Sequence, residues 1–157
     1  MPSITPLLWF DTDLAEPIAS YLSIFPDVTP PKERAAVDDG PILTATIELC
    51  GQQLMFLNGG PAHTGFTESI SLMVCVEGQD EIDDLWERLT ANGGEPGRCG
   101  WLKDRYGVSW QIVPTALVQY LGGSDPAGAK RAMQAMMQMV KLDIAALKKA
   151  YEGKSAA

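Results

Sequence analysis

The segment Cys99–Pro114 (CGWLKDRYGVSWQIVP) contains the side chains best suited to contact a small molecule. The amide of Gln111 offers both a hydrogen-bond donor and an acceptor, so it either orients a polar ligand or bonds to neighbouring backbone in the core. Trp101 either supplies an aromatic surface for a planar or apolar ligand or packs in the core. Trp110 has the opposite strand parity to Gln111, and we expect it to pack against a helix.

The other residue types that perform chemistry are scattered along the chain. Asp104 is expected to accept hydrogen bonds from amides of the turn that it begins. Asn58 either ends its strand by the same local bonding or faces a ligand cavity. The single histidine, His63, falls in a polar, glycine-rich loop. The cysteines lack CxxC spacing and are expected to be small apolar fillers in a reducing compartment: Cys50, Cys75 and Cys99.

Two successive halves of the sequence predict the same order of elements. The first half has strand patterns at Ile4–Phe10, Ile42–Leu49 and Leu54–Asn58, with a helix capped by Asp13 after the first strand. The second half has strand patterns at Ser69–Val76, Cys99–Lys103 and Val108–Val113, with a helix at Asp80–Asn92 after the first strand. Phe10 and Val76 occupy equivalent places, about 66 residues apart (76 minus 10), so the order of elements repeats.

Two stretches depart from this repeat. Asp27–Pro41 is rich in proline and charge and predicts an exposed loop with one short edge strand near Arg34–Val37. After Pro114 the pattern becomes helical, with a methionine-rich run at Ala132–Val140 and a further helix at Leu142–Tyr151. A methionine-rich amphipathic helix usually packs on its own core or on a partner subunit, and less often contacts a ligand.

Length and composition predict one ordinary globular domain covering residues 1–157. The 157 residues are 46% hydrophobic and 20% charged, enough to build a core. The net charge of −8 argues against a nucleic-acid or anionic-membrane partner, because phosphates require clustered Lys and Arg. No apolar run is long enough for a membrane span and the first residues have no export signal, so we expect a cytoplasmic, soluble protein.

Three motifs in the same order resemble the PhnB-like branch of the glyoxalase, or vicinal oxygen chelate, superfamily: TPLLWFDTDLAE, LTATIELCGQQLMFLNGGP and CGWLKDRYGVSWQIVP. The branch is often labelled a 3-demethylubiquinone methyltransferase-like domain, and the resemblance covers about residues 4–153. It implies an α+β fold in which two βαβββ modules, about 4–60 and 69–115, form a curved mixed sheet around a cavity. A helical extension, about 116–153, follows them, and relatives usually form homodimers.

Metal-binding members of this superfamily commonly place two histidines and two carboxylates on the inward faces of four strands. The resemblance puts the corresponding positions at Thr5 (give or take one residue), Met55 (or Phe56, if the register slips by one), Ser71 and Gln111. Their hydroxyl, thioether and amide groups carry no charge to offset dehydration of a divalent ion, so we expect no metal ligands and no cofactor. The same four positions, together with Asn58 and Trp101, are the expected ligand-binding residues.

The methyltransferase label finds no support in the residues, because the glycine pairs lie outside any G-x-G turn between a strand and a helix. Three functions stay open. The first is metal-independent binding of a small apolar or aromatic molecule in the cavity, which we rank first. The second is a metal-dependent lyase, isomerase or dioxygenase with non-standard ligands. The third is a dimeric structural module with no ligand.

Overall fold

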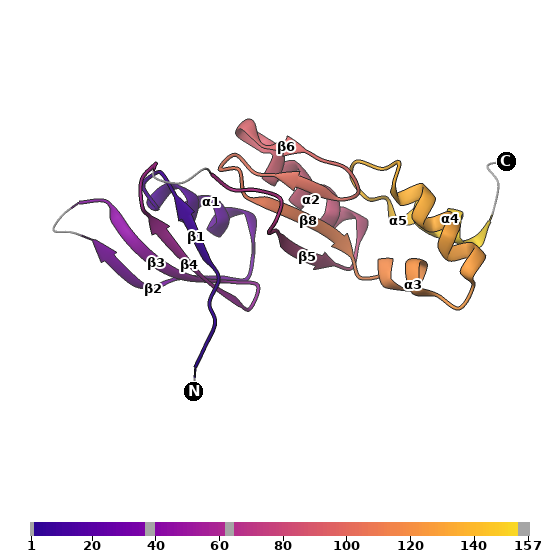
Figure 1. Ribbon diagram of the computed structural model, residues 1–157, viewed down its shortest axis with the longest axis horizontal. Coiled ribbons are helices and arrows are strands. Elements are labelled where there is room, and N and C mark those ends of the chain that lie inside the picture. Colours follow the sequence, from indigo (N-terminus) through magenta and orange to yellow (C-terminus); the bar gives the residue numbers. More distant parts are fainter. Residues whose placement is uncertain (1, 37–39, 62–64, 154–157) are drawn as a thin grey trace. The chain divides into compact units, whose positions relative to one another are not determined.

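The computed structural model describes residues 2–36, 40–61 and 65–153 (Figure 1). The chain divides into two compact units, Met1–Gly65 and Phe66–Ala157, and each is described here by itself. Each unit contains one four-stranded sheet with a helix between its first and second strands in the sequence. The second unit also carries three C-terminal helices.

The first unit has the order strand, helix and three strands. Its elements are β1 (Leu7–Phe10), α1 (Ala15–Ile24), β2 (Val28–Ala36), β3 (Ile42–Leu49) and β4 (Gln52–Asn58). The strands lie in the order β1-β4-β3-β2, with β1 parallel to β4 and the other pairs antiparallel. Cys50 and Gly51 both have positive φ and join β3 to β4, so the turn is two residues long where four were predicted.

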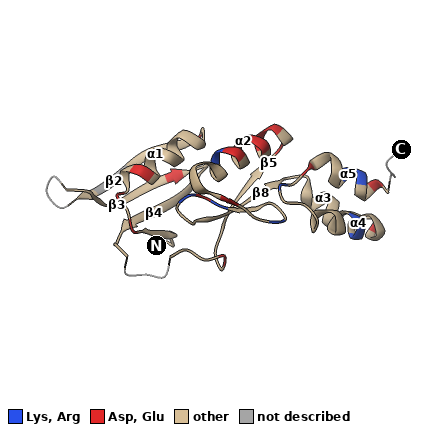
Figure 2. Ribbon diagram, turned by 90° about the horizontal axis from the view of Figure 1, so that it is seen from above, with Lys and Arg blue, Asp and Glu red and all other residues tan. Residues whose placement is uncertain are grey.

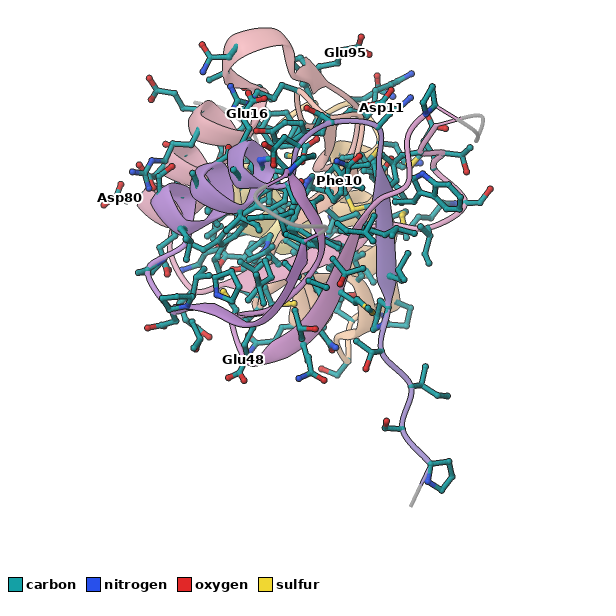
Figure 3. All side chains as sticks on the ribbon, turned by 90° about the vertical axis from the view of Figure 1, so that its left-hand side faces the viewer. Phe10, Asp11, Glu16, Glu48, Asp80 and Glu95 are labelled. Atoms are coloured by element: carbon teal, nitrogen blue, oxygen red, sulfur yellow. The ribbon has the colours of Figure 1, made fainter. Side chains whose placement is uncertain are left out.

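Alternating side chains of this sheet form a core with α1. Ala45 and Ile47 of β3 and Phe56 of β4 are each no more than 1% exposed, while the residues between them are half-buried. The Phe56 ring lies 5.0 Å from that of Phe10 and 5.8 Å from that of Tyr21 on α1, measured between ring centroids. Figure 3 shows Phe10 among the inner side chains and Glu48 at the periphery. The strand period of two therefore fixes which face meets the helix.

The prediction of a mainly irregular loop after α1 is wrong. β2 runs from Val28 to Ala36 and pairs with β3 along the edge of the sheet. Pro30 and Pro31 fall inside a register shift between Thr29 and Glu33, where the ladder does not use their missing N–H groups. An edge strand tolerates prolines in this way, although they read as loop residues in the sequence. Val37, the predicted end of the short strand, lies outside the described residues.

The second unit repeats this topology. Its elements are β5 (Leu72–Val76), α2 (Gln79–Thr90), the short 3-10 helix η1 (Ala91–Gly93), β6 (Glu95–Pro96), β7 (Trp101–Lys103) and β8 (Ser109–Pro114). The strands lie in the order β5-β8-β7-β6, with β5 parallel to β8. The predicted α+β fold of two βαβββ modules is confirmed. The two-residue strand β6 was not predicted, because its sequence, Glu-Pro, carries no strand pattern.

The core of the second unit lies between its sheet and α2. Ile82 and Leu89 of α2, with Trp110 and Ile112 of β8, are each no more than 1% exposed. Trp110 thus packs against a helix, as its parity predicted. The acidic residues of α2 lie on its outer side (Figure 2), which leaves the apolar stripe for the sheet.

Three helices complete the second unit: α3 (Leu117–Gly122), α4 (Pro126–Met136) and α5 (Ile144–Glu152). Asp125 caps α4 by accepting from the Ala127 amide at 3.0 Å. The segment between α4 and α5 is held to the module because Gly100 N donates to Val140 O at 2.8 Å. The buried Leu142 lies in the same segment. Within the described residues, no helix combines the length and apolar character needed to cross a membrane.

Candidate functional site

Each sheet has one face toward its helix and one face away from it. We call the face of the second sheet opposite α2 the α2-distal face. It carries the residues that alternate with the buried Leu102, Trp110 and Ile112. Its side chains come from β5 and the residue before it, from β7 and from β8: Ser71, Met73, Cys75, Trp101, Lys103, Ser109, Gln111 and Val113.

Three predicted site residues come together on the α2-distal face. The Gln111 amide Nε2 donates a hydrogen bond of 2.9 Å to Ser71 Oγ, across β8 and the lead into β5. Trp101 on β7 is the register partner of Gln111 on β8, so their side chains are neighbours on the same face. All three side chains are half-buried. The bond leaves the Gln111 amide oxygen and the Ser71 hydroxyl proton for other partners.

The remaining predicted site residues belong to the first unit. Met55 is the register partner of Leu7, and its amide donates to Pro6 O at 2.9 Å, so the lead into β1 that holds Thr5 lies beside β4. Thr46 of β3 is opposite Met55. Asn58 alternates with Met55 and is the register partner of the buried Phe10, which places Asn58 on the α1 side of the sheet. Asn58 is therefore separated from Met55 by the sheet itself.

The structure adds Ser109, which the sequence did not single out, to the α2-distal face. Ser109 is 2% exposed, and its hydroxyl oxygen has no hydrogen-bond partner among the described residues. A buried polar atom without a partner costs about 1–3 kcal/mol of stability, so it calls for an explanation. In hindsight, its position two residues before Gln111 on the same strand was the available signal.

Lys103, the register partner of Ser109, supplies a positive charge on the same face. Its ammonium Nζ lies 2.5 Å from Glu68 Oε1. This hydrogen bond lowers the pKa of the Glu68 carboxyl, and it raises the pKa of the Lys103 ammonium. Both groups are partly exposed to solvent, and Glu68 precedes β5 in a segment outside any strand.

The turn between β7 and β8 is built around a buried carboxylate. Asp104 is 5% exposed, and its Oδ1 accepts from the Tyr106 amide at 2.9 Å and the Val108 amide at 3.0 Å. Its Oδ2 accepts from the Trp110 indole Nε1 at 2.8 Å. Gly107 has a φ of 86°, as expected for the closing position of this turn. Asp104 thus has the predicted turn role, and it also fixes the start of β8.

Four positions correspond to the metal ligands of the superfamily: Thr5, Met55, Ser71 and Gln111. Their side chains do not fit a divalent ion. Gln111 and Ser71 bond to each other, and neither carries a carboxylate or an imidazole. Across residues 2–36, 40–61 and 65–153, no group of three or more His, Cys, Asp or Glu is arranged to hold a metal ion. His63 lies outside the described residues.

The interpretation of the thiols as buried fillers is wrong for two cysteines. Cys50 and Cys75 are exposed, and Cys99 is half-buried. Cys50 belongs to the hairpin turn, and Cys75 alternates with the buried Val76 on β5, so neither position faces a core. Cys99 Sγ lies 3.8 Å from Met137 Sδ.

Two βαβββ modules, each with a four-stranded sheet and a helix between its first and second strands, define a protein of the vicinal oxygen chelate superfamily. A family model described as 3-demethylubiquinone-9 3-methyltransferase matches residues 2–113, and the chain belongs to this PhnB-like family. The comparison with curated proteins gave no match.

Solved structures agree with this assignment. A putative 3-demethylubiquinone-9 3-methyltransferase, PhnB protein, from Bacillus cereus is 29% identical, with a TM-score of 0.65 over 73% of this chain and 100% of that one. Protein PA1353 from Pseudomonas aeruginosa is 21% identical, with a TM-score of 0.57 over 73% and 98%. The fosfomycin resistance protein FosX from Listeria monocytogenes, complexed with Mn(II) and sulfate, is 14% identical, with a TM-score of 0.55 over 77% and 95%. The last two show the fold alone.

Proposed function

We propose that the chain binds a small apolar or aromatic molecule on the α2-distal face and does so without a metal. The observation that carries this proposal is the hydrogen bond between Gln111 and Ser71 beside Trp101. It holds one amide next to an indole, which is the usual combination of an aromatic wall with a few fixed polar groups in a ligand site. Met73, 60% exposed on the same face, adds a soft apolar surface.

The chemistry of the side chains supports binding without a metal. Thr5, Met55, Ser71 and Gln111 offer hydroxyl, thioether and amide groups, none of them charged at neutral pH. A divalent ion that leaves water for any of these groups loses strong hydration and gains only a neutral ligand. An amide that already bonds to Ser71 is a better orienting group for an organic ligand than a ligand for an ion.

The turns between strand and helix give no support to methyl transfer. The Glu81 carboxylate oxygen Oε2 accepts from the amides of Glu77 and Gly78, at 3.1 and 2.9 Å, in the turn from β5 to α2. Asp13 Oδ1 likewise accepts from the Ala15 amide at 3.0 Å at the start of α1. In a loop that holds a nucleotide-like cofactor, such amides bind the cofactor instead. We therefore propose binding rather than methyl transfer.

The proposal predicts saturable binding of a neutral apolar dye by metal-free protein. The dye N-phenyl-1-naphthylamine, whose fluorescence rises in apolar surroundings, is titrated into untagged protein after elemental analysis. We expect no stoichiometric metal, no binding of nickel, zinc or manganese, and one dye per chain. Trp101→Ala should weaken dye binding about tenfold because it removes the aromatic wall.

Tyr120→Ala is the matched control, since it removes an aromatic ring from α3 in the same unit and should leave the dye affinity unchanged. One tightly held metal ion per chain would contradict the metal-free site. Absence of saturable dye binding, or equal affinities for the Trp101 and wild-type proteins, would contradict the proposed binding face.

We also propose that the chain works as a cytoplasmic homodimer. Met133, Met137 and Val140, at the end of α4 and just after it, are 42%, 50% and 50% exposed, which is an apolar patch suited to a second copy. Light scattering during gel filtration should give a mass about twice the 17.0 kDa of one chain.

The variant Met133→Lys with Val140→Lys should shift the protein toward one chain, because it places charges in the patch. Gln134→Lys, which adds the same charge at an exposed neighbouring position of α4, should leave the dimer intact. A single-chain mass for the wild-type protein, or a dimer unaffected by the double variant, would count against this patch.

A further inference from the structure

The buried Ser109 hydroxyl and the Lys103 ammonium are neighbours on the α2-distal face. They belong to register partners on β8 and β7, and both alternate with side chains that face α2. Ser109 Oγ finds no partner among the described residues, although a hydroxyl is both a donor and an acceptor. A positive charge beside an O–H donor is the basic unit of a site for an anionic oxygen.

In the free protein, the carboxylate beside Lys103 is that of Glu68. Glu68 reaches Lys103 from the segment Phe66–Ile70, which lies between the two modules in sequence and forms no strand. In the same segment, Phe66 Cδ2 lies 4.0 Å from where a Cβ on Gly107 would stand. The segment therefore lies near Lys103 at the end of β7 and near Gly107 in the turn that leads into β8.

We propose that Lys103 and Ser109 form a binding site for the carboxylate of an aromatic ligand, and that Glu68 occupies this site in the free protein. This inference rests on the proposed function, because it adds the charged end of the same ligand. The incoming carboxylate replaces Glu68 on Lys103, the segment Phe66–Ile70 moves off the sheet, and the Ser109 hydroxyl donates to the ligand. The aromatic part then lies toward Trp101, on the same strand as Lys103.

The contacts that Glu68 and Ser109 make in the free protein mean that this exchange costs little free energy. The ion pair between Lys103 and Glu68 is partly exposed, and such pairs contribute little to stability. The incoming carboxylate also gives the Ser109 hydroxyl, which has no hydrogen-bond partner among the described residues, an acceptor. The exchange leaves the charge on this face unchanged, because one carboxylate replaces another.

The charges around the site favour a monocarboxylate over a phosphate. Lys103 is the one cation that the register places beside Ser109, whereas phosphates are usually held by several donors and more than one positive charge. Glu95 of β6 is the other register partner of Lys103 and lies at the periphery in Figure 3. Its negative charge further disfavours a doubly charged ligand.

A matched pair of ligands tests the site. 1-Naphthoate and 1-naphthamide have the same ring and differ in charge, and each is used to displace N-phenyl-1-naphthylamine from the whole protein at fixed ionic strength. We expect 1-naphthoate to bind about tenfold more tightly than 1-naphthamide. Lys103→Met should reduce this ratio to about one and leave the naphthamide affinity unchanged, which also shows that the variant folds.

Two further variants separate the roles of Ser109 and Glu68. Ser109→Ala should weaken naphthoate binding severalfold, because the ligand loses one hydrogen bond. Glu68→Gln should strengthen naphthoate binding severalfold, because the competing carboxylate is gone, with no change for naphthamide. The control is Lys141→Met, since Lys141 forms a comparable ion pair with Asp83, 2.6 Å long, away from this face, and the ratio should stay at the wild-type value.

The outcomes distinguish this inference from the function on which it rests. Equal affinities of the wild-type protein for naphthoate and naphthamide would overturn the carboxylate site and leave the binding function standing. A naphthoate preference that survives Lys103→Met, or naphthoate binding weakened by Glu68→Gln, would also overturn it. Failure of the dye itself to bind would overturn the proposed function instead.

Discussion

Asp104→Ala should lower the free energy of unfolding by about 3 kcal/mol, the largest effect that we expect from removal of one polar side chain. The carboxylate is 5% exposed and accepts three hydrogen bonds, from two turn amides and the Trp110 indole. Its removal leaves buried donors without a partner and opens the turn that starts β8. Urea unfolding followed by circular dichroism measures the loss.

Asp125→Ala is the matched control, because Asp125 also accepts from a backbone amide, at 3.0 Å, but lies exposed at the start of α4. It should cost about 1 kcal/mol. Trp110→Phe should lower the free energy of unfolding less in the Asp104→Ala variant than in the wild type, because the hydrogen bond between the two residues is then already lost. A loss below 1 kcal/mol for Asp104→Ala would show that the turn does not depend on its carboxylate.

The fold was predictable because it rests on local patterns that repeat. The alternation in Ile42–Leu49 gave both the bounds of β3 and the face that meets α1. The opposite parities of Trp110 and Gln111 likewise placed one against α2 and the other on the α2-distal face. Asp104 and Gly107 were predictable because turn chemistry depends on a few adjacent residues.

The error after α1 arose because a neighbouring strand overrides local preference. Pro30 and Pro31 argue for a loop, yet β3 provides a partner for the residues around them and a register shift accommodates the prolines. The sequence left open whether Asn58 ends its strand or faces a ligand cavity, and its register with Phe10 places it on the α1 side of the sheet. Neither register shift nor facing direction at a strand end follows from residue type.

Only part of the candidate site could be predicted from the sequence. Ser71 and Gln111 were found through their equivalent places in a resemblance, and the structure adds the bond between them. Ser109 and Glu68 were missed because a serine and a glutamate are ordinary on a sequence. Ser109 matters because its buried hydroxyl has no partner among the described residues, and Glu68 matters because its carboxylate lies beside Lys103. Both features depend on how the chain packs.

Gly100→Ala should lower the free energy of unfolding by about 3 kcal/mol, because it disturbs the contact between the second module and the segment before α5. Gly100 has a φ of 83°, which L side chains rarely adopt. A Cβ there would lie 2.9 Å from Ile112 O and 3.0 Å from side-chain atoms of Leu142, which is fully buried. Gly100 also donates to Val140 O and accepts from Ile112 N, so the backbone has little room to move.

Gly51→Ala separates the steric effect from the backbone effect. Gly51 has nearly the same φ, 81°, but nothing lies within 4 Å of its Cβ position. Its substitution should cost about 1 kcal/mol from backbone strain alone. The difference of about 2 kcal/mol between the two variants then measures the close approach of Leu142 and of the Ile112 carbonyl oxygen to Gly100. Equal losses in urea unfolding would mean that the segment before α5 yields to a methyl group, and that the C-terminal helices are held to the module more loosely than their hydrogen bonds indicate.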